Sequence, residues 1–144
     1  MKLFAFCFLF AAVAAAECPA GMTSVPLKTI DGFLTVPVSV NGESPHNFVL
    51  DTGAQITTLS PEIAHGTPRI QETAVKGVNG NVAGYGTVVN SIAVGNATLT
   101  RHPVIVVPLG NFTGEAHKVQ GILGKDFFSN FDILIQHGKT VCIK

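Results

Sequence analysis

FVLDTGA, residues 48–54, carries the strongest signal in this chain of 144 residues. Its apolar half predicts a buried strand, and Asp51 follows at the end of that strand. A buried carboxylate is costly unless it is hydrogen-bonded or shared with a second one. Gly53 lets the backbone turn sharply and bring an amide close to the carboxylate, while Thr52 offers a hydroxyl and Ala54 adds no bulk. A carboxylate held in such a turn is suited to the acid–base activation of a water molecule.

The N-terminal residues 1–16 are typical of a secretory signal peptide. Lys2 provides a charged start, residues 3–13 are almost entirely apolar, and three alanines at 14–16 offer a cleavage site. The apolar run is shorter than the roughly 20 residues that a membrane span needs. We therefore expect a secreted or periplasmic protein that begins at Glu17, with no membrane association beyond the cleaved signal.

The overall charge argues against some classes of partner. Nine Lys and Arg balance nine Asp and Glu, so there is no electrostatic basis for binding nucleic acid or an anionic membrane. The five histidines are scattered without metal-ligand spacing, and we expect most of them to be solvated loop residues. The sequence therefore predicts neither a metal site nor a cofactor.

Two cysteines remain once the signal is removed, Cys18 and Cys142, one at each end of the mature chain. In an oxidising compartment they are able to form a disulfide that joins the termini, and the alternative is two unpaired thiols. A lipoprotein anchor on Cys18 is a poorer interpretation, because Glu17 occupies a position where a small residue is wanted.

Hydrophobic patterning predicts strands along most of the chain. Residues 33–40 alternate between apolar and polar or exposed positions, and Asn41-Gly42 is a turn that joins them to a returning strand at 46–50. Ser60 is the expected N-cap of a brief helix. The other expected elements are a short strand at 56–59, a long hairpin at 74–95 turning at 79–81, a strand at 97–108, one or two helical turns at 125–130, and a closing hairpin of residues 131–135 and 140–143.

Three motifs in order resemble the retropepsin-like aspartic proteases, the single-domain, retroviral type. They are DTGA at 51–54, the glycine-containing hairpin around residue 80, and GILGKD at 121–126. The resemblance implies an all-β fold: a single-lobe acid-protease β-barrel with a flap hairpin and one or two short helices. It covers residues 29–144, the expected protease domain, and leaves an N-terminal extension at 17–28 after the expected signal peptide at 1–16.

The resemblance makes Asp51, Thr52 and Gly53 the catalytic residues. Because the chain has one such motif, it implies a homodimer in which two Asp51 carboxylates share a proton and activate the water that attacks a polypeptide substrate. Thr52 would bond across the dimer, and the Gly53 amide would donate to the carboxylate.

The resemblance also implies a substrate-binding set around this centre. Residues 78–81 would form the flap tip, 122–124 would pack against the catalytic loop, and Ile56 would line an apolar pocket. The full set is Ala54, Ile56, Val78, Asn79, Gly80, Asn81, Ile122, Leu123 and Gly124.

The chain departs from the retroviral pattern at one pair of positions. Retroviral enzymes usually carry an acidic residue after the DTGA motif and an arginine in the late glycine motif, where this chain has Gln55 and Lys125. The alternative to an exported aspartic endopeptidase is therefore a retropepsin-like fold kept as a non-catalytic peptide-binding or assembly module.

Overall fold

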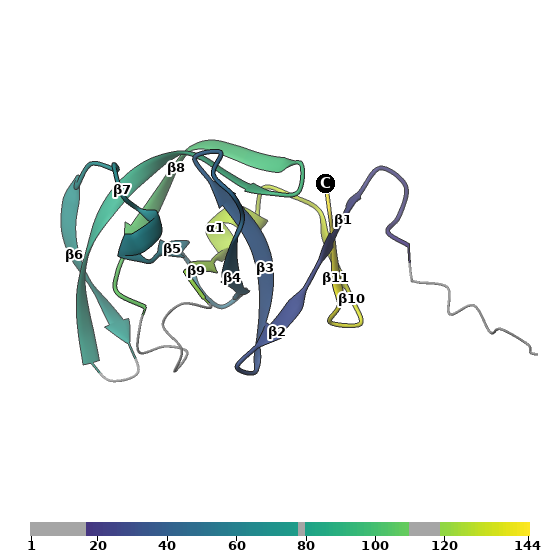
Figure 1. Cartoon of the computed structure of the whole chain (residues 1–144), viewed down its shortest axis with the longest axis horizontal. Helices are drawn as coiled ribbons and strands as arrows, with labels where there is room; N and C mark the ends of the chain where they lie inside the picture. Colours follow the sequence, from purple (N-terminus) through teal and green to yellow (C-terminus); the bar gives the residue numbers. More distant parts are fainter. Residues whose placement is uncertain (1–16, 78–79, 110–118) are drawn as a thin grey trace, which may run out of the picture.

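The computed structural model describes residues 17–77, 80–109 and 119–144 (Figure 1). The expected signal peptide at 1–16 and two flap-tip residues, Val78 and Asn79, lie outside the described residues. The regular structure of the described chain is almost entirely β-strand, which confirms the all-β class predicted from the sequence.

The strands form two sheets, one of eight strands in the order β2-β3-β4-β9-β5-β8-β7-β6 and one of three in the order β1-β11-β10. Two short helices complete the described part of the fold, the 3₁₀ helix η1 (Pro61–Ile63) and α1 (Lys125–Phe128). The strands are β1 (Thr23–Pro26), β2 (Lys28–Ile30), β3 (Phe33–Val40), β4 (His46–Leu50), β5 (Thr58–Leu59), β6 (Gln71–Gly77), β7 (Gly80–Val94), β8 (Ala97–Val106), β9 (Gly121–Leu123), β10 (Ile133–Gln136) and β11 (Thr140–Ile143).

The larger sheet curls back on itself. β3 pairs with β4 on one side and, at Ser39 and Val40, with β7 on the other, so that six strands form a hydrogen-bonded ring. Alternate residues of β3 point into this ring, as the pattern at 33–40 predicted. The largest fully buried side chains of the core are Phe48, Phe127, Leu59, Ile92, Leu123 and Ile143.

Strands β4 and β9 run parallel and in close contact, with Phe48 opposite Gly121 and Leu50 opposite Leu123. A Cβ atom on Gly121 would lie 2.2 Å from the Phe48 ring, so this approach requires glycine. The two strands end side by side, and the residues that follow them therefore meet.

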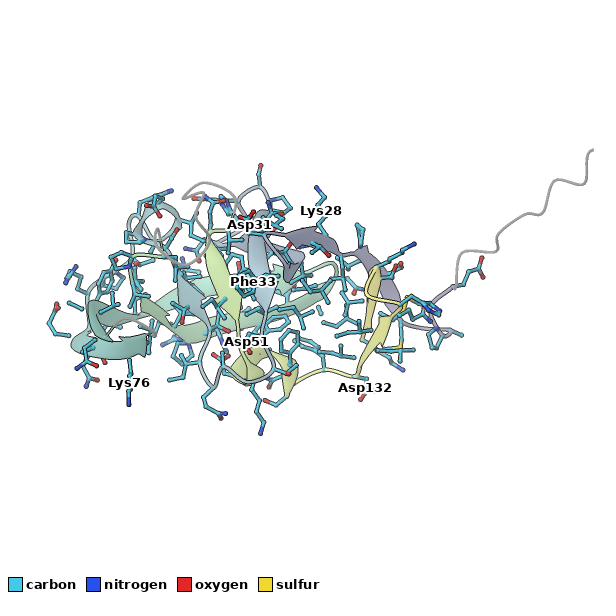
Figure 2. The ribbon with its side chains drawn as sticks, turned by 90° about the horizontal axis from the view of Figure 1, so that it is seen from below. Lys28, Asp31, Phe33, Asp51, Lys76 and Asp132 are labelled. Atoms are coloured by element: carbon cyan, nitrogen blue, oxygen red, sulfur yellow. A yellow bond between two sulfur atoms is a disulfide. The ribbon has the colours of Figure 1, made fainter. Side chains whose placement is uncertain are left out.

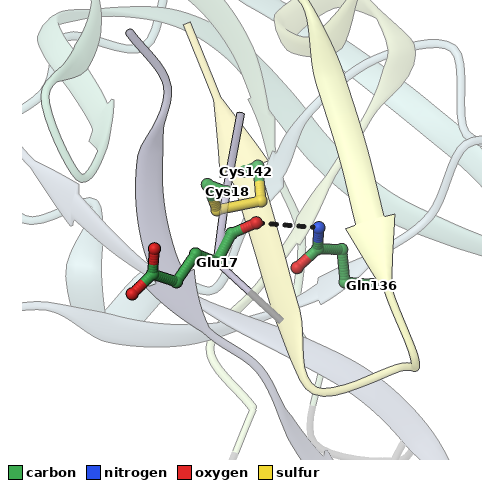
Figure 3. The surroundings of a disulfide bond; sticks show 4 residues. All are labelled: Glu17, Cys18, Gln136 and Cys142. Carbon is green, nitrogen blue, oxygen red and sulfur yellow. Dashed lines mark hydrogen bonds between the residues drawn. A yellow bond between two sulfur atoms is a disulfide. The ribbon is translucent and has the colours of Figure 1, made fainter. Parts of the chain in front are cut away.

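The three-stranded sheet is built from both ends of the described chain, and Figure 1 shows it beside β2 and β3. β1 pairs with β11, and a disulfide joins Cys18 to Cys142 with their Cα atoms 5.5 Å apart (Figure 3). Gln136 adds a hydrogen bond from its Nε2 to the Glu17 carbonyl at 3.4 Å. Hydrophobic patterning predicted neither β1 nor β2. Val25 is the one buried residue in these two short strands, so the sequence shows no alternation there.

Smaller differences from the expected elements have local causes. The helix at Pro61 is a single 3₁₀ turn, and the Ser60 side chain makes no capping hydrogen bond, so the expected N-cap is wrong in that respect. The expected strand at 56–59 is reduced to β5, because the Thr57 amide bonds a side chain instead of a strand. Within the described residues, no helix has the length and apolar character needed to cross a bilayer.

We expect the disulfide to stabilise the fold substantially, since it closes a loop across a sequence separation of 124 residues. Replacing Cys18 with serine (Cys18→Ser) should lower the free energy of unfolding by about 2–5 kcal/mol in urea titrations. A reducing agent should bring the wild type down to the level of the variant and leave the variant unchanged. An equal midpoint for both oxidised proteins would contradict a stabilising bond.

Candidate active site

Asp51 lies at the end of β4, where the chain leaves the sheet. Its amide donates to the Leu123 carbonyl at 3.2 Å, which continues the β4–β9 pairing by one residue. Its carboxylate is held from within the turn: Oδ1 accepts hydrogen bonds from the amides of Gly53 at 2.9 Å and Ala54 at 3.2 Å. Figure 2 shows Asp51 between the hairpin that carries Lys76 and the turn that carries Asp132.

The second oxygen of this carboxylate is not engaged by the turn. Both amide bonds go to Oδ1, and within the described residues Oδ2 has no hydrogen-bond partner. Asp51 is half-buried, and the neighbouring Thr52 and Gly53 are exposed. A carboxylate that is oriented by one oxygen and open at the other can bind a water molecule or a second carboxylate.

The segment that follows Asp51 is fixed by the residues after β9. The Lys125 amide donates to the Ala54 carbonyl at 2.7 Å, and the Asp126 amide donates to the Gln55 carbonyl at 3.3 Å. Gly124 makes this contact possible, because a Cβ there would lie 2.9 Å from the backbone of Ile56. Where retroviral enzymes use an ion pair, backbone hydrogen bonds here join the segments that carry Gln55 and Lys125.

Asp126 is the second carboxylate of this region, and its hydrogen bonds differ from those of Asp51. Oδ1 accepts from the Thr57 hydroxyl at 2.7 Å and from the amides of Thr57 and Phe127 at 2.9 and 3.0 Å. Oδ2 lies 2.9 Å from His102 Nε2 and 3.0 Å from the Thr57 amide. The Thr57 hydroxyl in turn accepts from the Gly124 amide at 3.1 Å.

These partners decide the protonation of Asp126. Burial raises the pKa of its carboxyl, but the hydrogen bonds from His102 and from the Thr57 amide and hydroxyl outweigh that effect. The net pKa is lowered from the ordinary value of 3.8. Asp126 is therefore an ionised, hydrogen-bonded structural carboxylate, whereas Asp51 carries the open oxygen.

His102 is an exception to the expectation that most histidines are solvated loop residues. It lies in β8 with its side chain about 10 % exposed, against Asp126. The sequence analysis also did not identify Thr57 as a site residue, because nothing in the sequence distinguishes this threonine from others that follow a turn. Its contact with residue 126 depends on the parallel alignment of β4 and β9, which hydrophobic patterning does not reveal.

The other residues of the expected site are distributed around Asp51. Ala54 is half-buried beside the carboxylate, and the Ile56 side chain is 46 % exposed. Gly80 and Asn81 are exposed where β7 begins, Ile122 is half-buried in β9, and both Leu123 and Gly124 are buried. In particular, Leu123 is fully buried, so its side chain supports the loop rather than lining a surface.

A shallow apolar groove of about 410 Å³ begins beside the Asp51 turn at Leu50 and Thr52 and runs to β10. The rest of its lining is apolar: Phe128, Phe131, Ile133, Leu134 and Ile135. No group of three or more His, Cys, Asp or Glu residues that could hold a metal ion occurs in the described part of the chain.

Comparisons with known proteins agree with this fold. A family model described as aspartyl protease matches residues 36–127. The EIAV protease complexed with the inhibitor HBY-793 is 26% identical over 67% of this chain and 85% of its own, with a TM-score of 0.52. A retropepsin-like aspartic protease from Rickettsia conorii shares the fold, with 18% identity over 85% of this chain and 90% of its own and a TM-score of 0.60. No curated protein sequence matches the chain.

The lowered pKa of Asp126 predicts how stability depends on pH. A carboxyl whose pKa is lower in the folded state contributes stability above its unfolded pKa, and this contribution is lost as the pH falls through the folded value. The free energy of unfolding of the wild type should therefore fall more steeply between about pH 5 and pH 2 than that of Asp126→Asn. Urea titrations across this range test the prediction, and parallel curves for the two proteins would contradict it.

Proposed function

Because the chain belongs to the retropepsin-like aspartyl protease family, we propose that it is an exported endopeptidase in which two copies each contribute one Asp51. The observation that carries the proposal is the Asp51 carboxylate, held on Oδ1 by two amides and open at Oδ2. A purely structural carboxylate has its lone pairs filled, as those of Asp126 are.

The proposed reaction needs two carboxylates in contact. Two such groups share one proton, because they cannot both be ionised at close range. The ionised carboxylate takes a proton from a water held between the two, and that water attacks the peptide carbonyl. The protonated carboxylate donates to the carbonyl oxygen, so each Asp51 serves one of the two roles.

The substrate class follows from the surroundings of Asp51. Extended peptides bind mainly through their backbone, with alternate side chains entering pockets. The exposed Ile56 and the half-buried Ile122 offer apolar surface near the carboxylate, and the hairpin of β6 and β7 extends to one side of it (Figure 2). We therefore propose an extended polypeptide with apolar side chains around the bond that is cleaved.

The outer edge of strand β10 is a place where two copies can pair. Asp132 and Lys144 exchange both backbone hydrogen bonds across the β10–β11 pair. Since hydrogen-bonded and non-hydrogen-bonded pairs alternate along antiparallel strands, the backbone groups of Ile133 and Ile135 point away from β11. Among the described residues these groups have no partner, and the apolar groove beside Thr52 ends at the same strand.

The termini restrict other arrangements. β1 pairs with β11 of its own chain, and the Cys18–Cys142 disulfide holds that end in place. We propose that two β10 strands pair antiparallel about a two-fold axis, which would give one six-stranded sheet beneath the two Asp51 loops. The disulfide and the apolar residues 3–13 both support export into an oxidising compartment.

Peptide cleavage tests the proposed chemistry. Purified residues 17–144 should cut a mixed peptide library between about pH 3 and 7, the range over which a coupled carboxylate pair titrates. Asp51→Asn should cut nothing at any pH, because the amide cannot accept the proton from water. Equal cleavage by both proteins would contradict the role of Asp51, and an inactive, strictly monomeric wild type would favour a peptide-binding module instead.

A proline placed in β10 tests the proposed interface. Ile135→Pro removes an N–H that does not bond β11, so the monomer should keep its fold while dimerisation and cleavage are lost. Ile135→Val keeps the N–H and should behave as the wild type, and Leu134→Pro, which removes a bond to β11, should lower the melting temperature instead. Sedimentation velocity measures the dimer, and an unchanged dimer in Ile135→Pro would exclude this edge as the interface.

A further inference from the structure

His102 is buried because the alternation of inward- and outward-facing side chains is interrupted in two neighbouring strands, β7 and β8. In β8, Ala97 and Leu99 face the core, but after Arg101 the inward residues are His102, Val104 and Val106. Odd-numbered residues of β8 therefore face inward before Arg101, and even-numbered residues face inward after it.

The backbone at the break is unusual. Arg101 has φ of 52°, a left-handed conformation that non-glycine residues seldom adopt. The opposite position on β7, Asn90, is left out of the otherwise continuous β7–β8 pairing, and its amide bonds the Asn41 side chain at 2.7 Å instead. Such conformations cost free energy and persist where the surrounding structure enforces them. Here the result is an imidazole, in place of Arg101, pointing at Asp126.

Hydrogen bonds lead from His102 to the catalytic loop in two steps. An ionised carboxylate only accepts hydrogen bonds, so His102 Nε2 donates to Asp126 Oδ2 at 2.9 Å. The other oxygen of Asp126 holds the Thr57 amide and hydroxyl. Thr57 ends the segment that begins at Asp51, and its carbonyl accepts from the Ile105 amide at 3.1 Å.

We propose that His102 is a positioning residue for the reaction, which through Asp126 and Thr57 fixes the loop that presents Asp51. The proposal rests on the proposed protease function for its consequence in catalysis, but the positioning itself is a property of the folded chain. The groups that face the Asp126 carboxylate are the Thr57 amide and hydroxyl, the Phe127 amide and the His102 imidazole. The neighbouring cations Arg101 and Lys125 are exposed.

The catalytic consequence follows from the geometry that two shared carboxylates require. Both must lie within hydrogen-bond distance of one water, so a small displacement of either loop lowers the rate of the chemical step. Peptide binding depends mainly on backbone contacts elsewhere and should change less. Loss of the His102 hydrogen bond should therefore reduce kcat by about 10- to 100-fold and change KM much less.

Four variants, measured with the wild type, separate this role from general stability. His102→Leu removes the hydrogen bond, His102→Asn keeps a polar side chain that is too short to replace Nε2, and His102→Gln places an amide N–H near that position. His46→Leu is the matched control: His46 is half-buried, bonds Gln120 at 2.8 Å, and lies at the opposite end of β4 from Asp51.

Kinetics give the first result. Both His102→Leu and His102→Asn should lose kcat, with the acid limb of the pH profile shifted to higher pH because Asp126 loses a hydrogen bond to its ionised form. His102→Gln should recover most of the activity, and His46→Leu should keep the wild-type kcat even if its melting temperature falls. Wild-type kcat in His102→Leu, or an equal loss in His46→Leu, would overturn the proposal.

Amide hydrogen exchange gives a second result that does not depend on activity. Exchange at Gly53, Ala54 and Thr57 should be faster in His102→Leu and His102→Asn than in the wild type, His102→Gln or His46→Leu. A wild type that fails to cleave any peptide would contradict the proposed function alone, and the exchange rates would still decide the positioning role. Unchanged exchange at these three amides would overturn it.

Discussion

The parallel pairing of β4 with β9 is the contact on which the rest of the structure depends. It places the ends of two strands side by side, so that the turn after Leu50 and the segment after Leu123 meet. The pairing is possible because Gly121 leaves room for the Phe48 ring, which fills the centre of the core. A side chain at 121 would separate the strands and with them the two segments that form the site. Core packing and the geometry of the Asp51 loop therefore rest on the same contact.

The carboxylates of the two segments joined by this pairing differ in their hydrogen bonds. Asp126 has both oxygens occupied by Thr57, His102 and the Phe127 amide, and these bonds keep it ionised despite its burial. Asp51 is bonded on Oδ1 and open on Oδ2. A saturated carboxylate stabilises a fixed arrangement of the backbone, whereas an open one is available for a water or a second carboxylate. The saturated group orients the loop that carries the open one.

Much of this arrangement could be predicted from the sequence, because it depends on local patterns. The alternation of apolar and polar residues predicted β3, and Asn41-Gly42 predicted the turn that connects it to β4. The DTGA motif at 51–54 indicated the position of the loop. The network around Asp126 could not be predicted in the same way. His102 faces inward only because Arg101 adopts a positive φ, and no pattern of apolar residues encodes that break. β1 was missed for a related reason, since its stability comes from pairing with β11, 114 or more residues later in the chain.

The disulfide-linked three-stranded sheet limits the ways in which two chains could pair in the proposed dimer. Since β1 is already paired with β11, interleaving the termini of two chains would require breaking β1–β11 hydrogen bonds and moving a segment that Cys18 ties to Cys142. The outer edge of β10 requires neither change. Its outward backbone groups belong to Ile133 and Ile135, and Leu134 and Ile135 expose 42 % and 40 % of their surface. An unpaired, uncharged edge strand next to apolar surface favours association, and here it ends a groove that begins at Thr52. The disulfide that fixes the termini thus leaves the outer edge of β10 open, on the side where the proposed reaction would place a second copy.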